Sequence, residues 1–489
     1  MRDGQQYLSD LRDKRYVTVD GSAVADVTRH PGMRGIAGTV AGVMDLHYGP
    51  GSAELLTTCP ETGEVIPWSY ALAADAAGVR SRGRYYTTIA RATGGLLGRS
   101  PDFLATLLAS WYASADVFGY RDKRYTANVV AHYRRARQDN LCHTHAISDP
   151  PGDRRADGRA TASALRKTGE TGDGIVVRGV KMLATFAPLA DELLVYPFRP
   201  LGPQEEAQAM AFSIPIGTPG LALLCRRPLA RGDSAAVAPL RERFDELDAL
   251  CVFDDVLVPH ERVFIDGDVE LCNSLRQRTQ MTSYLWHQST IRVAVKAELM
   301  LGAATLVARA TGRDGQAGIR SMLGEMAAKA EALHSLVAAA EAAAGPGPGG
   351  HYVAAWSPLA AAGVLGTEFF PRLTELLQLA GSSNLVMQPG EQDLAGPAAE
   401  IFRSYLGSGA AANGGDDLGG EPAEVLRLAA ELAIGDFGGR QLLFERFYLG
   451  APEALRDRYF QGTDTGPAEE LVRGLLRPAR AGESPQADQ

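Results

Sequence analysis

The stretch from Cys142 to Arg154 holds the side chains best suited to acid–base chemistry. Its two imidazoles, His143 and His145, alternate with small residues, and a Pro-Pro-Gly-Asp turn follows them. Because histidine titrates near neutral pH, either ring could exchange a proton with a bound substrate. Turn residues of this kind fix the backbone and favour close approach to a ligand. The pattern predicts a loop, rather than a helix or a strand, that carries the functional histidines.

Other familiar catalytic signatures are absent from the sequence. No Gly-x-Gly-x-x-Gly follows a strand and opens a helix, no Gly-x-x-x-x-Gly-Lys-Ser/Thr occurs, and there is no Gly-x-Ser-x-Gly elbow. His143 and His145 lack further ligands in a zinc or iron register, so we expect no metal centre. General acid or base work fits the histidines better, but the residues alone leave the reaction undetermined.

A helix start near residue 100 would present a second functional group. Residues 98–102 read Gly-Arg-Ser-Pro-Asp, which places a capping serine, a first-turn proline and a first-turn acid as a helix N-terminus favours. Apolar residues three and four apart extend this helix to Trp111. Arg99 would lie just before the first turn of this helix. A functional arginine and a solvated arginine on a core helix are equally good interpretations.

Composition and charge narrow the class of protein. The 489 residues exceed what one hydrophobic core usually supports, so we expect two or three packed regions. The formal net charge of -9 argues against a nucleic-acid surface and against a polybasic membrane patch. Five cysteines without a Cys-x-x-Cys pair indicate a reducing compartment, and no window approaches 18 consecutive apolar residues. These features predict a soluble cytoplasmic enzyme that acts on a small organic substrate.

The hydrophobic spacing indicates an α protein with a β region inside it. Between Gly174 and Phe264, short apolar runs lie between turns without helix-length patterns to separate them, which favours antiparallel strands. Stripes at helical spacing in residues 291–306 and 322–333 then predict a bundle of long helices. A later helix at residues 425–433 should end at the glycine pair 438–439.

Six segments, taken in order, resemble the oxygenase component of the 4-hydroxyphenylacetate 3-monooxygenase family, which has an acyl-CoA-dehydrogenase-like fold. The resemblance covers nearly the whole chain, and the order and spacing of the segments make it specific. The segments are 26–31 (DVTRHP), 98–102 (GRSPD), 144–147 (THAI), 181–186 (KMLATF), 253–259 (FDDVLVP) and 437–441 (FGGRQ).

The resemblance implies a mainly α fold with a central β-barrel. An N-terminal helical domain would span residues 1–141, the β-barrel 142–267, and a C-terminal helical bundle 268–489, which would also build a homotetramer as a dimer of dimers. Reduced FAD would come from a separate flavin reductase. That supply would explain why the chain has no nicotinamide-binding fingerprint.

The implied reaction hydroxylates a small aromatic substrate with O2. In the family, oxygen adds to reduced FAD to give a C4a-hydroperoxide, and its distal oxygen is transferred to the carbon ortho to a phenol hydroxyl. By resemblance, Arg99 and His145 hold the phenolic oxygen, because a cation and an imidazole favour its phenolate character. Thr185 would hydrogen-bond the flavin near N5.

Further cofactor-binding residues follow from the same resemblance. Two segments are alternatives for the part that closes over the cofactor, and a helix terminus without a ligand is the plain interpretation of both. The implied cofactor-binding residues are His145, Ala146 and Ile147, then Pro151, Gly152, Asp153 and Arg154, and the two alternatives, Gly439, Arg440 and Gln441 or Ala451, Pro452, Glu453 and Ala454.

Two departures from the family pattern concern the implied substrate-binding residues Phe103, Phe198 and Arg199. Phe103 stands where the family has a tyrosine that bonds the substrate hydroxyl, and Phe198-Arg199 replaces small hydroxyl residues that receive a carboxylate. Arg199 could bind an acidic tail or simply be a solvated surface arginine. A site that exchanges hydroxyl partners for a ring discriminates differently, so we expect a phenol-like natural-product intermediate rather than 4-hydroxyphenylacetate.

Three other functions stay open at this point. N-hydroxylation of an amine would keep the fold and is motivated by Phe103. A flavin-dependent dehydratase is disfavoured, because Arg99 and Phe103 stand where such an enzyme needs cysteines for an iron–sulfur cluster. A non-catalytic binding protein is disfavoured by the number of family site residues kept. The sequence leaves open whether the substrate is free or tethered to a carrier.

Overall fold

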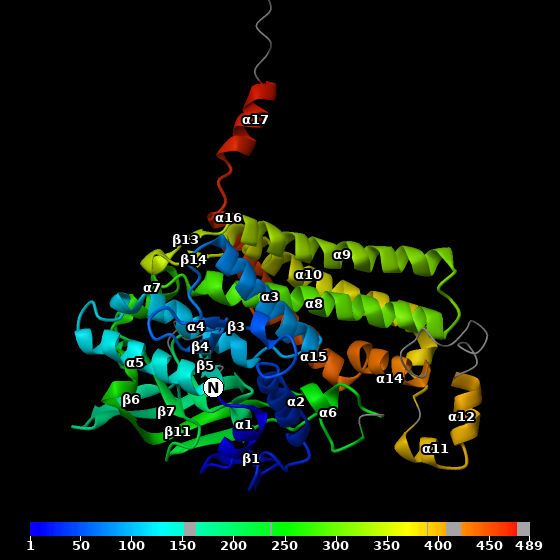
Figure 1. The fold of residues 1–489 in the computed structure, drawn as a ribbon, viewed down its shortest axis with the longest axis horizontal. Coiled ribbons are helices and arrows are strands. Elements are labelled where there is room, and N and C mark those ends of the chain that lie inside the picture. The colour runs from blue at the N-terminus through cyan, green and yellow to red at the C-terminus, as the bar shows by residue number, and fades with distance from the viewer. Residues whose placement is uncertain (151–162, 235–236, 389, 407–421, 477–489) are drawn as a thin grey trace, which may run out of the picture.

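Long helices and β-sheets occupy two adjoining regions of the molecule (Figure 1). The computed structural model describes residues 1–150, 163–234, 237–388, 390–406 and 422–476. The helices are α1 (Gly4–Asp10), α2 (Arg34–Asp45), α3 (Ala76–Ala92), α4 (Pro101–Ala113), α5 (Lys123–Asp139), α6 (Arg241–Phe244), α7 (Val269–Arg278), α8 (Met281–Ala310), α9 (Ala317–Ala342), α10 (Trp356–Gly381), α11 (Glu391–Ala395), α12 (Ala399–Leu406), α14 (Pro422–Ala433), α15 (Asp436–Phe447), α16 (Pro452–Gln461) and α17 (Gly466–Leu476).

Two sheets contain most of the strands. The larger has the order β2-β1-β10-β11-β7-β6 and the smaller β12-β9-β8-β5. The strands are β1 (Tyr16–Val19), β2 (Ser22–Ala23), β3 (Leu56–Thr58), β4 (Val65–Pro67), β5 (His143–Ala146), β6 (Arg166–Glu170), β7 (Gly174–Thr185), β8 (Glu192–Val195), β9 (Met210–Pro215), β10 (Leu221–Cys225), β11 (Asp248–Pro259), β12 (Val263–Asp266), β13 (Gly345–Pro346) and β14 (Tyr352–Val353).

The pairing within these sheets is mainly antiparallel, as the sequence predicts. The exceptions among the described strands are the parallel pairs β1 with β10 and β5 with β8. Neither of the two described sheets closes on itself. The mixed architecture of helices and sheets is therefore present, whereas the closed central barrel that the resemblance implies is not confirmed.

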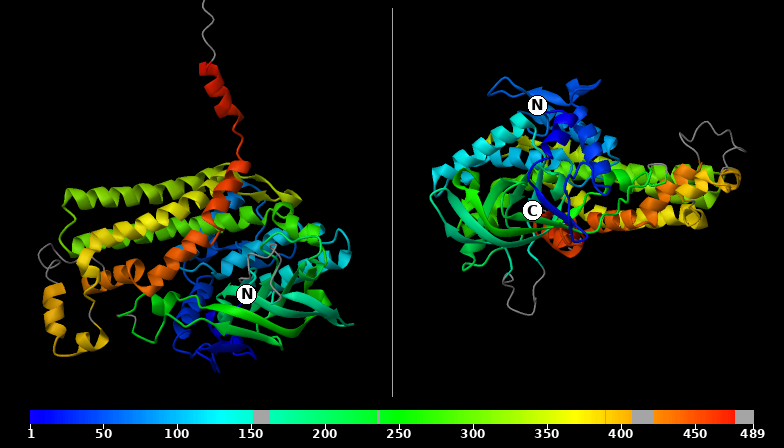
Figure 2. Two further views of the ribbon diagram at one scale, coloured as in Figure 1. Left: turned by 180° about the vertical axis from the view of Figure 1, so that it is seen from behind. Right: turned by 90° about the horizontal axis from the view of Figure 1, so that it is seen from below.

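The three longest helices, α8, α9 and α10, lie side by side and form the bundle that the periodic stripes predict (Figures 1 and 2). Helix α8 is the central member, since it also packs against α3, α4 and α14. Its first half is buried on almost every side, including the charged residues Arg292 and Lys296. Charged groups at such positions need partners, which α15 supplies.

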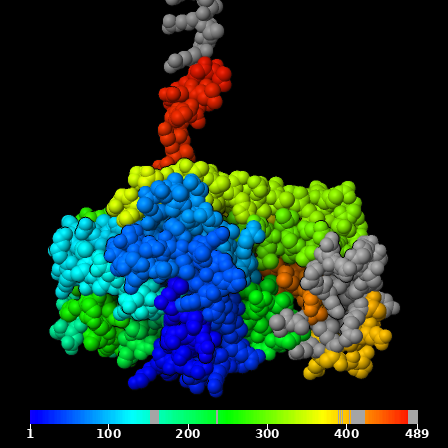
Figure 3. Space-filling view, in the orientation of Figure 1, coloured from blue at the N-terminus to red at the C-terminus, as the bar shows by residue number. Residues whose placement is uncertain are grey.

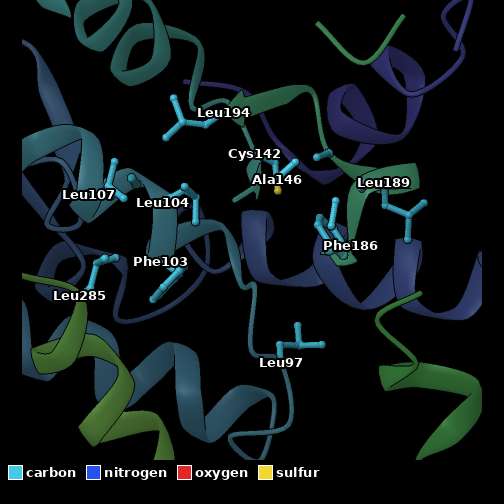
Figure 4. Packing of buried hydrophobic residues seen from close by; sticks show 14 of the residues in the cluster. Leu97, Phe103, Leu104, Leu107, Cys142, Ala146, Phe186, Leu189, Leu194 and Leu285 are labelled. Carbon is cyan, nitrogen blue, oxygen red and sulfur yellow. The ribbon is translucent and has the colours of Figure 1, made fainter. Parts of the chain in front are cut away.

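Helix α4 connects the bundle to the sheets. Every residue from Pro101 to Trp111 is buried. Phe103 and Leu104 of this helix belong to the same buried cluster as Ala146 of β5 and Phe186 just after β7 (Figure 4). An apolar helix enclosed on all sides is fixed by packing, so the residues at its start are held in place.

Two local predictions are wrong. Residues 143–146 form strand β5 rather than a loop, paired in parallel with β8 and buried along its whole length. The glycine pair near residue 438 does not end a helix, because α14 stops at Ala433 and Gly438 lies in the first turn of α15. A Cβ on Gly438 would lie 2.2 Å from the carbonyl oxygen of Leu432, so this glycine permits a close approach between helices.

The C-terminal helix α17 stands away from the rest of the molecule (Figure 3). Its apolar residues Leu471, Val472, Leu475 and Leu476 are all more than half exposed. Within the described part of the chain, every helix is too short or too polar to cross a lipid bilayer.

Candidate active site

Arg99 and His145 meet where the start of α4 faces β5. Arg99 Nη2 donates to His145 Nε2 at 2.8 Å, and His145 Nδ1 lies 3.0 Å from the Tyr196 hydroxyl. A guanidinium can only donate, so Nε2 accepts and the ring proton belongs to Nδ1, which donates to Tyr196. Burial, together with the charges of Arg99 and Arg276, lowers the pKa of His145 well below its usual value. The imidazole is therefore neutral near pH 7, with an acceptor nitrogen facing Arg99.

The backbone at Arg99 is fixed by a buried carboxylate. The N–H groups of Gly98 and Arg99 donate to Glu246 at 2.8 and 2.5 Å. The Arg99 guanidinium lies 4.8 Å from the Phe103 ring centre and 4.7 Å from that of Tyr448, and its buried Nε has no hydrogen-bond partner among the described residues. Arg99 thus retains a donor for an additional oxygen, in an apolar environment where such a bond is strong.

Phe103 lies against both members of this pair. Its ring meets the His145 ring edge-on at a centroid distance of 6.0 Å and the Tyr448 ring at 5.7 Å. Tyr448 in turn shares a hydrogen bond of 3.1 Å with Ser289 of α8. The aromatic residues exclude water from the side of Arg99 that faces α8 and α15.

Thr185 is held at the end of β7 by a charged network. Its hydroxyl donates to Asp248 at 2.7 Å, and Arg440 and Arg226 both bind Asp248. Burial alone would raise the pKa of Asp248, but Arg440 and then Arg226 lower it to about 2. An ionised Asp248 accepts the hydrogen bond from the Thr185 hydroxyl, whose oxygen can then accept a bond from another donor. This donor and acceptor arrangement fits reduced flavin, whose N5 carries a hydrogen.

Two segments are alternatives for the part of the chain that closes over the cofactor. In the first, residues 439–441, the polar side chains are already bound within the protein. Arg440 binds Asp248 and the carbonyl of Glu246, while Gln441 joins Lys296 to the carbonyl of Leu96. Gly439 lies in α15 with open space around it. The other alternative, residues 451–454, is the exposed start of α16, where Ala451 is the N-cap, Pro452 the first residue, and Glu453 and Ala454 follow in the first turn.

The remaining implied cofactor residues adjoin the His145 strand. Ala146 is fully buried, and the Ile147 carbonyl accepts a bond of 3.4 Å from Lys181. Pro151, Gly152, Asp153 and Arg154 lie outside the described residues. The described residues thus place His145 and Thr185 on strands of different sheets that contact each other, since the Thr144 hydroxyl donates to the Thr185 carbonyl.

Phe198 and Arg199 lie beyond Tyr196, after β8. Arg199 binds Asp149, Glu205 and the side chain of Gln208, so it is neither a solvated nor a free cation. The Phe198 ring is 41% exposed and lies under the Arg276 guanidinium at 4.5 Å. Arg199 is therefore already neutralised, and Phe198 is accessible.

Several residues around this site escape detection from sequence. Tyr196, Glu246 and Asp248 carry no motif, and their roles depend on strand register and on contacts across the fold. The same holds for a buried trio in which Glu445 binds Arg292 at 2.6 and 2.8 Å and Lys296 at 2.7 Å. The signal that could have found Tyr196 is the strand before it, because β5 pairs with β8 up to Val195.

A second imidazole cluster lies behind β5 and is satisfied by its own hydrogen bonds. His132, His143 and Glu192 bring ligand atoms within 4.8 Å of one another. His143 Nδ1 faces the Leu141 carbonyl and its Nε2 faces His132 Nε2 at 3.2 Å, while Arg135 and Arg262 bind Glu192. Two arginines beside the carboxylate oppose a cation, and the geometry gives His143 the structural role of an acceptor for His132.

Comparison with known proteins places the chain in a family. It matches the 4-hydroxyphenylacetate 3-hydroxylase N-terminal family over residues 3–265 and the C-terminal family of the same enzyme over residues 272–477. It is 35% identical over 480 residues to the 4-hydroxyphenylacetate 3-monooxygenase oxygenase component of Thermus thermophilus, covering 97% of both chains. It is 29% identical to a Streptomyces globisporus monooxygenase of a 3-chloro-4-hydroxyphenyl amino acid carried on a peptidyl-carrier protein, covering 93% of this chain and 86% of that one.

Solved structures agree with this placement. The crystal structure of a 4-hydroxyphenylacetate 3-monooxygenase oxygenase component complexed with FAD superposes with a TM-score of 0.90 at 34% identity, covering 98% of both chains. An archaeal 4-hydroxybutyryl-CoA dehydratase shares the fold, with a TM-score of 0.86 at 20% identity, covering all of this chain and 97% of that one. The chain belongs to the 4-hydroxyphenylacetate 3-hydroxylase family and is the oxygenase component of a two-component, FADH2-dependent monooxygenase.

Proposed function

We propose that this enzyme hydroxylates a phenol-like substrate at the carbon ortho to its hydroxyl, with Arg99 and His145 holding the phenolic oxygen. The observation that carries the proposal is the 2.8 Å contact between Arg99 Nη2 and His145 Nε2. One group can only donate and the other accepts, and both lie in an apolar enclosure. This is the pair of partners that a phenol hydroxyl needs, since its oxygen accepts and its hydrogen donates.

The roles of the two residues follow from their charges. On binding, the phenol hydroxyl replaces Arg99 as the donor to His145 Nε2, which has one lone pair, while Tyr196 keeps the ring proton on Nδ1. Arg99 donates to the phenolic oxygen and stabilises negative charge on it, which lowers the pKa of the phenol and enriches the ortho carbon in electrons. Bound reduced flavin with O2 supplies the electrophilic oxygen atom. Phe103 and Tyr448 exclude water from this reaction.

The same proposal assigns the cofactor and the assembly. Thr185 accepts a hydrogen bond from flavin N5, and residues 145–147 and 151–154 line the flavin, with residues 451–454 closing over it. Residues 451–454 are preferred to 439–441 because Arg440 and Gln441 already bind buried partners. The proposal also includes domain boundaries after residues 141 and 267 and a homotetrameric assembly. It places the enzyme in the cytoplasm, where a separate reductase delivers FADH2.

The preferred substrate in this proposal is a phenol other than 4-hydroxyphenylacetate. Phe103 offers no hydroxyl to the substrate, and Arg199 is occupied by Asp149 and Glu205. N-hydroxylation of an amine has less support, because the Arg99 cation beside the site repels an ammonium group. The Streptomyces relative, which acts on a chlorohydroxyphenyl group, supports a phenol-bearing natural-product intermediate.

The experiment supplies the purified protein with FAD, a flavin reductase, NADH and oxygen, and offers matched panels of phenols and anilines. We expect a catechol product from at least one phenol, with the position of the new oxygen established by NMR. His145→Ala should lower the turnover rate about 10²- to 10⁴-fold, the usual contribution of a positioned acid or base. His260→Gln, at a partly buried position outside the proposed site, is the control. No oxygenated phenol, or parental turnover in His145→Ala, would overturn the proposal.

A further inference from the structure

An open cavity of about 770 Å³ lies between α7, the start of α8, the segment around β13 and β14, and the end of α16. Two arginines line it from different elements, Arg276 on α7 and Arg458 on α16. The indole of Trp356, at the start of α10, forms part of the wall. A cavity of this size and mixed lining is typical of sites that take small organic ligands.

The two arginines have no anionic partner in the described part of the chain. Arg276 donates to the carbonyl of Phe198 at 2.9 Å and stacks on the Phe198 ring, and no ion pair forms at either Arg276 or Arg458. Burial lowers the pKa of Arg276, and the charge of Arg458 acts in the same direction. Two like charges that face one cavity repel each other until an anion binds between them.

The cavity adjoins the proposed site for the phenol ring. Arg276 donates to the carbonyl of Phe198, two residues after Tyr196, whose hydroxyl bonds His145. The charge of Arg276 also contributes to the lowered pKa of His145, after burial and Arg99. Phe198 follows Tyr196 by two residues, and its ring lies under the guanidinium of Arg276, which lines the cavity. A tail that leaves the ring site past Phe198 would therefore meet Arg276 rather than Arg199, which Asp149 and Glu205 already neutralise.

We propose that Arg276 and Arg458 bind a carboxylate or phosphate on an extended tail of the phenolic substrate. This proposal rests on the proposed function and adds a tail to the substrate class. The volume exceeds what the two-carbon arm of 4-hydroxyphenylacetate would fill, and Trp356 offers an apolar surface to a longer chain. Paired arginines provide the forked, permanently charged donors that carboxylate and phosphate oxygens accept.

The first test measures binding, which requires no turnover. Isothermal titration calorimetry would compare 4-(4-hydroxyphenyl)butanoate with its primary amide, for the native protein and for Arg276→Gln, Arg458→Gln and the double variant. We expect the native protein to bind the acid more tightly, and each single substitution to reduce the acid-over-amide ratio about tenfold, as loss of one charge-assisted bond does. Arg276→Lys should restore part of the ratio.

Arg278→Gln is the matched control, since it lies on α7 two residues away, stacks on the exposed Tyr120 ring and is not part of the cavity wall. It should leave the ratio unchanged. Thermal melting of each variant checks that the fold is intact. Equal affinity of the native protein for acid and amide, or a ratio unaffected by Arg276→Gln and Arg458→Gln, would overturn the proposal.

A second experiment tests whether the two arginines bind the substrate tail or the phosphates of the cofactor, since both groups are anionic. Binding of FAD and of riboflavin would be compared in the same variants. If the substitutions weaken FAD relative to riboflavin while the acid-over-amide ratio stays constant, the arginines belong to the cofactor and the proposal fails. If the ratio falls while FAD binding and hydroxylation of 4-methylphenol persist, the tail site is supported. A native protein that oxygenates no phenol would refute only the proposed function.

Discussion

A single residue, Arg99, contacts most of the groups that define the proposed ring site. It donates to His145, lies over Phe103 and Tyr448, and its own backbone N–H is bound by Glu246. Each of these contacts comes from a different part of the fold. A small change in any of them would therefore shift the position of the Arg99 guanidinium. Substitutions of the side chains that contact the Arg99 guanidinium are therefore expected to change substrate preference.

Phe103→Tyr tests this expectation directly. The Arg99 guanidinium lies 4.8 Å from the centre of the present ring, and a hydroxyl on that ring would offer one more hydrogen bond to a phenol held by Arg99. We expect the affinity for 4-hydroxyphenylacetate to rise about three- to tenfold, which corresponds to about 1 kcal/mol for one net hydrogen bond. Phe447→Tyr, at a half-exposed position of α15, is the control. Unchanged or weaker binding in Phe103→Tyr would show that position 103 does not face the substrate.

At the scale of single residues, the sequence predicts the site residues that belong to a motif. It does not predict the residues that hydrogen-bond to them. Arg99 follows from a helix-start signature and His145 from its titratable ring, and the structure brings the two together. Tyr196, Glu246 and Asp248 belong to no local pattern. Their importance comes from strand register and from carboxylates that reach across the fold, which a single sequence does not reveal.

At the scale of elements, the N-terminus of α4 is held by α15 as well as by Glu246. A Cβ on Gly98 would lie 2.1 Å from the Phe444 ring, so Gly98 permits α15 to pack against the helix mouth. We expect Gly98→Ala to lower the free energy of unfolding by about 1–3 kcal/mol, the usual cost of overpacking. It should also lower hydroxylation, because Arg99 is the next residue.

The control is Gly302→Ala in α8, where no atom lies within 4 Å of the added Cβ. Removing a glycine from a helix interior should stabilise that variant by about 0.5–1 kcal/mol. Denaturant unfolding measures both changes. Equal stability of the two variants would contradict the close packing of Gly98 on Phe444.

Periodicity predicts some elements and fails for others, for physical reasons. The stripes of α8 and α9 are long enough to define one helical face, and both helices are confirmed. Strand β5 has only four residues, all buried, so it lacks the alternation that marks a half-buried strand, and its partner β8 lies about fifty residues away. The glycines of α15 serve contacts between helices, which local rules assign to a helix end.

At the scale of the whole molecule, buried neutral histidines couple stability to pH. Five of them are at most 5% exposed, and burial is the main cause that lowers the pKa of each, namely His47, His132, His143, His145 and His287. In the unfolded chain these rings titrate near 6.5, so below that pH the unfolded state binds more protons than the folded state. The stabilisation is complete above about pH 7 and is lost on acidification.

We expect the free energy of unfolding to change little from about pH 7 to 8 and to fall below about pH 6.5. Each histidine contributes up to about 1.4 kcal/mol per pH unit. Urea unfolding at a series of pH values measures the slope. His132→Gln should flatten it, whereas His260→Gln, outside this set of five buried histidines, is the control and should not. An identical slope in native protein and His132→Gln would contradict this origin of the acid sensitivity.

The overall layout was predictable because it comes with a resemblance that spans the chain. The open form of the two sheets was not, since closure depends on contacts between edge strands that no motif encodes. Charge and cysteine content constrain the class of partner but carry no information about the 770 Å³ cavity, which forms only where α7, α10 and α16 meet.

The short strand β5 has one more consequence, which concerns how the enzyme can diversify. Its neighbouring residues Thr144 and His145 serve different surroundings: the first binds the Thr185 carbonyl, and the second binds Arg99 and Tyr196. Because successive side chains of a strand point to opposite faces, mutational drift around His145 leaves the Thr144 contacts in place. Under the roles proposed for His145 and Thr185, substitutions beside His145 are expected to change the accepted substrate while the contact between Thr144 and Thr185 persists.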